Sequence, residues 1–151
     1  MIINTTRFGV IEVDDNALIS MPAGMIGLEN LTNYCLIDHQ PESILKWLQS
    51  TQDSAVAFLV IDPSEVVSNY EFELSDSDVD SLDLKDATDA VVMTTVTIDP
   101  DSKYVSTNLM APVVVNSQTR TARQVVIDDG KYPLKHVISG SGTPVAQMVA
   151  A

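Results

Sequence analysis

The sequence has one cysteine, few aromatic residues and few basic residues among its 151 positions. A single thiol, Cys35, excludes a framework of internal disulfides. It lies in the apolar stretch 34–37, where no basic neighbour would lower its pKa, so we expect a buried, unreactive side chain. This cysteine usage indicates a reducing compartment, the cytoplasm.

Long apolar segments are also absent. The longest unbroken apolar run is residues 55–61, far short of the roughly 20 residues that a membrane helix needs. No basic stretch followed by an apolar one opens the chain, so no secretion signal is visible. A length of 151 residues, 45% of them hydrophobic, predicts one domain with a substantial core.

Positive charge is scarce, and what there is lies mostly in the last third. Residues 1–101 hold 3 basic and 19 acidic side chains, whereas residues 102–151 hold 5 basic and 2 acidic ones, which together give the net charge of −13. Such a chain is not expected to bind nucleic acid or an anionic membrane non-specifically. A basic protein partner is the natural complement, although the charge alone is equally compatible with a very soluble acidic protein.

Short runs of alternating or β-branched residues, separated by turn residues, dominate what is present. They predict strands at 8–13, 17–21, 34–37, 55–61, 90–98, 105–116 and 123–127, while 44–49 is compatible with either a strand or a helical turn. The fold class that follows is mainly β, a small antiparallel barrel-like domain with one or two short helices. Residues 1–138 form this single domain, and the uncharged segment 139–151, which opens Ser-Gly-Ser-Gly, is expected to be a flexible tail.

One helix is well marked, starting after Ser75. The Ser75 side chain is placed to cap the first free amides, and Asp78 stands at the capping-box position. Leu74 and Val79 are spaced as a hydrophobic staple around this start. Leu82 is expected to face the core with Val79.

No constellation in the sequence indicates catalysis, a cofactor or a metal. Asp76, Asp78 and Asp80 resemble the start of a calcium loop, but Ser81 and Ala87 stand where that loop needs glycine and glutamate. The two histidines, at 39 and 136, have no second ligand at a metal-binding spacing. Trp47 is interpreted as a core anchor, with an interface role left open.

Several phrases, in order along the chain, resemble the FliW family of flagellar assembly factors. The most specific is residues 108–116, Asn-Leu-x-Ala-Pro-Val-Val-x-Asn, followed by Tyr70-Glu71-Phe72 with the helix start after it. The others are TTRFGVIEV (5–13), PAGMIGLEN (22–30), WLQS (47–50), AFLVIDP (57–63) and QVVIDDGKYPLKH (124–136). Together they cover nearly all of residues 2–138.

This resemblance implies a cytoplasmic regulator without enzymatic activity. Proteins of the family bind CsrA, a basic RNA-binding repressor of translation, and they bind flagellin. Flagellin that accumulates in the cell captures the family protein and frees CsrA to silence flagellin synthesis, and export of flagellin reverses the exchange. The acidic charge agrees with such a partner.

For partner contacts we predict the acidic side chains near the helix, the aromatic residue beside them and one asparagine: Tyr70, Glu71, Glu73, Asp76, Asp78, Asp80 and Asn108. Phe72 is a further apolar candidate, although alternation would place either it or Tyr70 in the core. In 106–116 we expect two strand pieces joined by a kink at Ala111-Pro112, with Asn108 bonding the backbone groups that the kink frees. A fold-defining bend and a partner contact are both compatible with this segment.

Three other functions fit parts of the sequence. A flavin-binding small-barrel enzyme would need phosphate ligands, for which Arg120, Arg123, Lys131 and Lys135 are the clustered candidates. A free-standing calcium-binding module would use the acidic residues. A flagellin-specific chaperone without a regulatory role would bind flagellin and leave CsrA alone.

Overall fold

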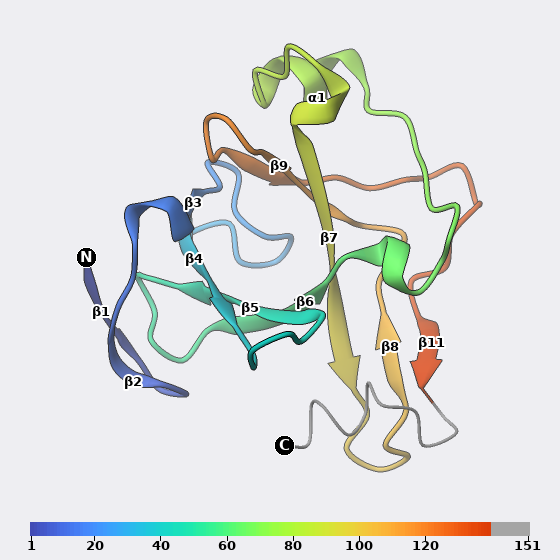
Figure 1. Cartoon of the computed structure of the whole chain (residues 1–151). Helices are drawn as coiled ribbons and strands as arrows, with labels where there is room; N and C mark the ends of the chain where they lie inside the picture. Colours follow the sequence, from blue (N-terminus) through green and yellow to red (C-terminus); the bar gives the residue numbers. More distant parts are fainter. Residues whose placement is uncertain (140–151) are drawn as a thin grey trace.

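The computed structural model describes residues 1–139, and this part of the chain is built mainly of β-strands (Figure 1). A single α-helix, α1 (Asp76–Ser81), and three 3-10 turns, η1 (Asp15–Ala17), η2 (Pro63–Glu65) and η3 (Ala87–Asp89), are found in it. The strands are β1 (Ile2–Thr5), β2 (Gly9–Glu12), β3 (Leu18–Ser20), β4 (Asn33–Asp38), β5 (Leu45–Ser50), β6 (Ala57–Ile61), β7 (Ala90–Ile98), β8 (Val105–Thr107), β9 (Val113–Asn116), β10 (Ala122–Gln124) and β11 (His136–Ser139).

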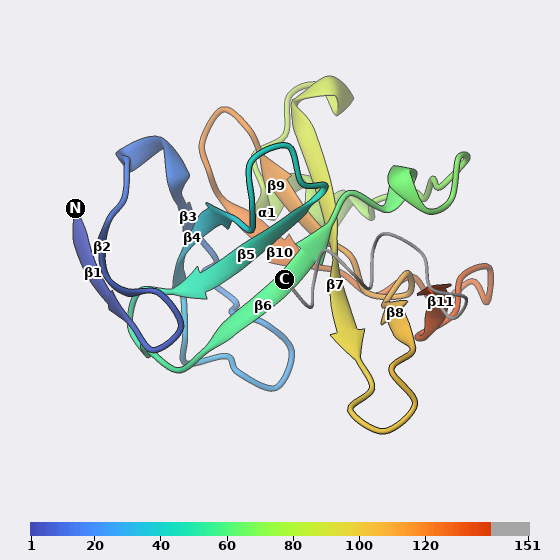
Figure 2. The ribbon, with the colours of Figure 1, turned by 60° about the horizontal axis from the view of Figure 1, so that its bottom comes forward.

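All the strand pairs are antiparallel. β1 and β2 form a separate hairpin, and the other nine strands form one sheet in the order β10-β9-β7-β6-β5-β4-β3, with β8 joining β7 to β11. The sheet is strongly twisted, so that β5 and β6 run obliquely to β7 (Figure 2). Its ends, β10 and β3, meet only at one bridge between Ser20 and Thr121. The predicted antiparallel β class is confirmed, and the sheet is open rather than closed into a barrel.

β7 is the longest strand and is shared by both halves of the sheet. Its first half pairs with β9 and its second half with β8, while β6 pairs with its other edge. Between the Met93–Val113 pair and the Val96–Thr107 pair, β7 advances by three residues and the returning chain by six. The returning chain therefore carries three extra residues between β8 and β9.

These extra residues form the kink predicted at Ala111-Pro112. Asn108 Oδ1 accepts hydrogen bonds from the backbone N–H groups of Met110 and Ala111, both at 3.0 Å. The asparagine thus satisfies donors that the kink removes from the sheet, as expected. The Pro112 carbonyl accepts a hydrogen bond from the Val125 N–H at 2.9 Å, which keeps the bend within the sheet.

The core lies mostly on the inner faces of β3 to β9. Tyr34, Leu48 and Val113 are fully buried in its largest cluster. Trp47 belongs to a second cluster and is a core anchor, as predicted. The residue is only 9% exposed, its ring centre lies 4.2 Å beneath the Arg7 guanidinium carbon, and its indole N–H donates to His39 Nδ1 at 3.0 Å. Cys35 is fully buried, and burial raises the pKa of its thiol above the usual value.

Helix α1 begins where the sequence predicts. Ser75 is its N-cap, and the Ser75 hydroxyl oxygen accepts a hydrogen bond from the Asp78 N–H at 3.1 Å. Leu82, just past the last helical residue, is 1% exposed and packs with Val114 and Val125. Val79 is half-buried. The helix therefore lies over the β9–β10 end of the sheet through its C-terminal side.

Asn116, the last residue of β9, ties this helix to the sheet. The residue is 2% exposed, and its Nδ2 group donates to the Leu82 carbonyl at 2.8 Å and to the Asp83 carbonyl at 3.2 Å. Its Oδ1 accepts hydrogen bonds from the N–H groups of Gln118 and Thr119 at 2.9 and 3.3 Å. One buried amide thus holds both the helix end and the β9–β10 turn.

Three predictions of secondary structure need revision. Of the ambiguous residues 44–49, all but Ile44 belong to β5, and both β1 and β11 lie where the sequence indicates no strand. Ser139, expected to open the tail, still pairs with Val105 in β11. The rest of the predicted tail, residues 140–151, lies outside the described residues.

Candidate functional site

Residues 70–75 form an extended segment that leads from η2 to α1 without joining a sheet. Tyr70 anchors its start, because its hydroxyl donates to the Leu109 carbonyl at 2.7 Å. The Tyr70 ring lies tilted against the rings of Tyr132 and Phe72, 4.5 and 5.7 Å away, centre to centre. The Glu71 N–H donates to the Tyr132 hydroxyl oxygen at 2.9 Å. An aromatic group therefore binds this segment to the chain around Tyr132.

An ion pair binds the other end of the segment. Asp78, in the first turn of α1, lies 3.2 Å from Arg123 of β10 and has a side chain only 21% exposed. We expected Asp78 to be an exposed acid, whereas its side chain is partly buried in an ion pair, and its part in a partner contact stays a prediction. Its carboxylate is already occupied, because the helix start packs against β10. Arg123, a candidate phosphate ligand in the flavin alternative, is neutralised in the same contact.

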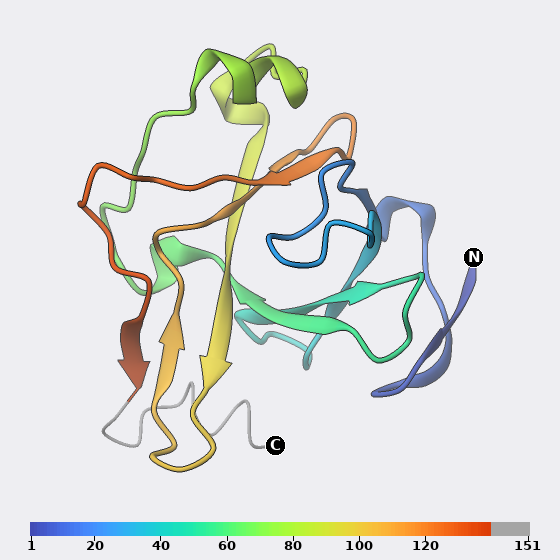
Figure 3. The ribbon, with the colours of Figure 1, turned by 180° about the vertical axis from the view of Figure 1, so that it is seen from behind.

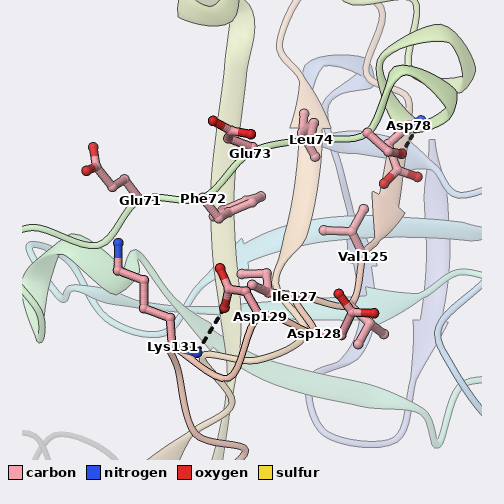
Figure 4. A pocket seen from close by; sticks show the side chains of 12 residues that line it. Glu71, Phe72, Glu73, Leu74, Asp78, Val125, Ile127, Asp128, Asp129 and Lys131 are labelled. Atoms are coloured by element: carbon pink, nitrogen blue, oxygen red, sulfur yellow. Dashed lines mark hydrogen bonds between the residues drawn. The ribbon is translucent and has the colours of Figure 1, made fainter.

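Between the Tyr70–Tyr132 contact and the Asp78–Arg123 ion pair lies a groove of about 670 Å³. We call it the acidic groove and define it by the segments 71–75 and 125–131, with Asp78 at one end. Phe72, Leu74, Val125 and Ile127 supply apolar side chains to its floor. Figure 4 shows Phe72 and Val125 lying between the carboxylates of the two walls. A volume in this range is typical of binding sites in proteins.

Acidic side chains line the rim of this groove. Glu71 and Glu73 are exposed on one wall, and Asp128 and Asp129 are exposed on the other. The single basic residue of the lining, Lys131, extends its ammonium over the Tyr132 ring at 5.4 Å. The groove therefore combines an apolar floor with a negative rim, an arrangement suited to a ligand that carries both apolar and basic groups.

A second hollow, of about 620 Å³, lies on the opposite side of the same segment. Its floor is apolar and includes Leu84, Ala90, Val92 and Val114. Residues 71–74 line both hollows. The segment is thus a narrow wall between two depressions.

The predicted contact residues are only partly brought together. Glu71 and Glu73 line both depressions, Tyr70 lines the apolar one, and Asp78 lines the acidic groove. Asp76 and Asp80 are exposed on α1 but line neither. Asn108 lies apart, in a hollow of about 440 Å³ with Ile26, Val126 and Leu134.

The second wall, residues 125–131, was not among the predicted contacts. The sequence predicts a strand at 123–127, and only the fold reveals that the stretch from Val125 to Lys131 faces residues 71–75. In Figure 3 the chain after β9 runs across the back of the molecule toward β11. The tyrosine pair 70 and 132, separated by 62 positions in sequence, marks the meeting of the two walls.

Residues 1–139 offer neither a metal-binding cluster nor a membrane-spanning helix. No group of three or more histidine, cysteine, aspartate or glutamate side chains is arranged to hold a metal ion. No helix in this part of the chain has the length and apolar character needed to cross a membrane.

Comparison with known proteins decides the family. A profile described as FliW protein matches residues 2–138. The chain belongs to the FliW family. "Flagellar assembly factor FliW" of Clostridium botulinum is 37% identical over 138 residues, which span 91% of this chain and 98% of that protein. The protein of the same description from Ruminiclostridium cellulolyticum is 37% identical over 139 residues, covering 91% and 94% of the two chains.

A solved structure supports the same assignment. It is described as the crystal structure of the flagellar assembly factor FliW, and it matches with a TM-score of 0.84 and 25% identity over 95% of this chain and all of that one. The FliW match in sequence ends at residue 138, inside β11. The resemblance inferred from the sequence phrases is thereby confirmed, and the chain is a flagellar assembly factor of this family.

Tyr70, which anchors the segment 70–75, should make the free energy of unfolding fall in alkaline solution. Burial, and to a smaller extent the neighbouring Tyr132, raises the pKa of Tyr70 well above its usual range. Below the unfolded value of 10.0 both states keep the proton, and above it only the unfolded chain releases it, so the free energy of unfolding falls as pH rises past 10.0. Urea titrations should show this fall in the wild type and a weaker one in Tyr70→Phe.

Tyr104→Phe, a change of the same kind at an exposed tyrosine, is the matched control for that measurement. Tyr70→Phe should also cost about 1 kcal/mol at neutral pH through loss of the bond to Leu109. Parallel pH profiles for the wild type and Tyr70→Phe would contradict the prediction.

Proposed function

We propose that this chain binds the basic translational regulator CsrA and, in alternation, cytoplasmic flagellin, without catalysing a reaction. Membership of a family of flagellar assembly factors supports a role in flagellar biogenesis. The observation that carries the proposal is the rim of the acidic groove, where four exposed carboxylates stand against one lysine that already contacts a tyrosine ring.

The charge distribution explains how such a partner would be chosen. A protein that binds RNA phosphates carries clustered lysine and arginine side chains, and a partner with a net charge of −13 attracts them over several ångströms. The same field repels RNA from the complex. Binding this chain would therefore disfavour RNA on CsrA even if the two ligands contact different surfaces.

Alternation between partners would link synthesis of flagellin to its export. Flagellin retained in the cytoplasm would occupy the chain and leave CsrA free to repress flagellin mRNA. Once flagellin is exported, the chain would return to CsrA and relieve the repression. The coupling requires only that the two complexes exclude one another.

A competition experiment tests this proposal. The purified chain is mixed with labelled CsrA, and flagellin is titrated in while the size of the CsrA complex is followed. We expect a complex with CsrA that weakens as salt is raised and that flagellin displaces. A stable assembly of all three proteins would overturn the alternation. Binding of flagellin without CsrA would identify a flagellin chaperone with no regulatory role.

Charge reversal locates the contact. Glu71→Lys with Asp76→Lys and Asp80→Lys is expected to weaken CsrA binding at least tenfold. Asp78 is left unchanged because its ion pair with Arg123 supports the fold. The matched control reverses Glu12, Asp15 and Asp101, three exposed acids elsewhere, and so alters net charge equally. Equal weakening by both variants would show a general charge effect and no contact near α1.

A further inference from the structure

The chain beyond β10 continues the sheet but leaves one edge unpaired. The Val125 N–H donates to the Pro112 carbonyl at 2.9 Å, and the Ile127 N–H donates to the Met110 carbonyl at 2.8 Å. Gln124 pairs with Val113 in the same register. Residues 124–127 therefore behave as an irregular extension of β10, held to the kinked segment on one side only.

Antiparallel geometry fixes where the other backbone groups point. Since Val125 and Ile127 direct their N–H groups to the kinked segment, Val126 and Asp128 direct theirs to the opposite edge. In the described part of the chain, neither of these two N–H groups has a hydrogen-bond partner in the protein. β10 is the last strand of the sheet order, so no strand within residues 1–139 covers this edge.

The opposite wall of the acidic groove, residues 71–75, also has backbone N–H groups without a partner among residues 1–139. The N–H groups of Phe72, Glu73 and Leu74 also lack a protein partner among residues 1–139. The ends of the wall are fixed by the Tyr70–Tyr132 contact and the Asp78–Arg123 ion pair. Two extended segments with free backbone groups thus border one groove and are held apart at both ends.

We infer that this edge receives an extended, basic peptide segment of a protein partner as an added β-strand beside residues 125–128. Strand addition satisfies the free groups of Val126 and Asp128 and places alternate side chains of the peptide over the groove floor. Lysine and arginine side chains then reach Glu71, Glu73, Asp128 and Asp129 on the rim. The inference deepens the proposed function, on which it rests, by giving the shape and charge of the partner segment.

Charge and polarity argue for this occupant over others. A second copy of the chain would bring a net charge of −13 to an acidic rim, which disfavours it. An acidic peptide is disfavoured for the same reason. The apolar floor formed by Phe72, Leu74, Val125 and Ile127 fits small apolar residues alternating with the basic ones.

A synthetic probe tests the backbone directly. A fluorescein-labelled seven-residue peptide of alternating lysine and valine is titrated with the full chain at low salt, and its anisotropy gives the dissociation constant. Two further versions carry N-methyl groups on alternate amides, in one frame or in the other. An added strand turns only every second amide toward the edge. N-methylation of the amides that face the edge should therefore weaken binding more than tenfold, and N-methylation of the other amides should weaken it less than about threefold.

Variants of the protein test where the peptide binds. Glu73→Lys with Asp128→Lys should weaken the unmodified peptide more than tenfold, whereas Glu12→Lys with Asp15→Lys should change its affinity less than about threefold. Equal effects of the two N-methyl frames, or of the two charge variants, would overturn the inference. So would the absence of peptide binding at low salt.

The same variants separate this inference from the proposed function. If the Glu73 and Asp128 variant loses the peptide but binds intact CsrA and flagellin as the wild type does, the groove is not the partner site, and the inference fails while the function stands. If the wild type binds the peptide but neither protein, the proposed function fails.

Discussion

Replacing Asn116 by alanine is expected to lower the free energy of unfolding by about 3 kcal/mol. The change removes a buried amide that bonds two carbonyls after α1 and two N–H groups of the β9–β10 turn. It leaves the buried Leu82 carbonyl without this partner, which costs more than the bond itself contributes. For a domain of this size the midpoint of thermal unfolding should fall by roughly 6–12 °C, measurable by calorimetry.

Two further variants make that measurement specific. Asn116→Asp keeps the acceptor for the turn but sets a carboxylate oxygen against the Leu82 and Asp83 carbonyls, so it should be no more stable than the alanine variant. Asn30→Ala removes the same group from an exposed loop and should change stability by less than about 0.5 kcal/mol. A loss below 1 kcal/mol for Asn116→Ala would show that the amide does not hold the helix.

Gly24→Ala is expected to cost about 3–4 kcal/mol, because two separate penalties add. Gly24 has a φ of +68°, in the left-handed region that a side chain disfavours. An added Cβ would lie 2.6 Å from Glu29 Cα and 2.9 Å from the Glu29 carbonyl oxygen. These are backbone atoms, which cannot rotate away as a side chain would. Urea titration of the variant gives the free energy directly.

Gly130→Ala separates the two penalties. Gly130 has a similar φ of +75°, but a Cβ there meets no atom within 4 Å. It should therefore show the conformational cost alone, about 1 kcal/mol. Equal losses in the two variants would mean that the loop around Gly24 moves to relieve the contact.

The local parts of this fold are readable from sequence because their causes are local. Ser75 and Asp78 predict the helix start, since a cap acts within three residues of itself. Asn108 predicts its own bonds to Met110 and Ala111 for the same reason. β1 and β11 are not predicted from their own residues, because the strands that pair with them, β2 and β8, determine them more than their own residues do.

The candidate site is less predictable, because it depends on pairs of residues distant in sequence. Glu71 and Glu73 are identified from their charge, but their opposition to Asp128 and Asp129 follows from the path of the chain after β10. Asp78 shows the converse. Its sequence neighbours indicate a place in the helix start and an exposed acid, and only the fold shows the approach of Arg123. Charge can be counted from a sequence, whereas its availability depends on tertiary contacts.

The shared strand β7 also bears on how the domain unfolds. Its residues bond to β6 on one edge and to both β8 and β9 on the other. Neither half of the molecule can come apart without releasing groups that the other half needs. Melting of this protein should accordingly be a single all-or-none event, with the amides of β7 the last to exchange with solvent.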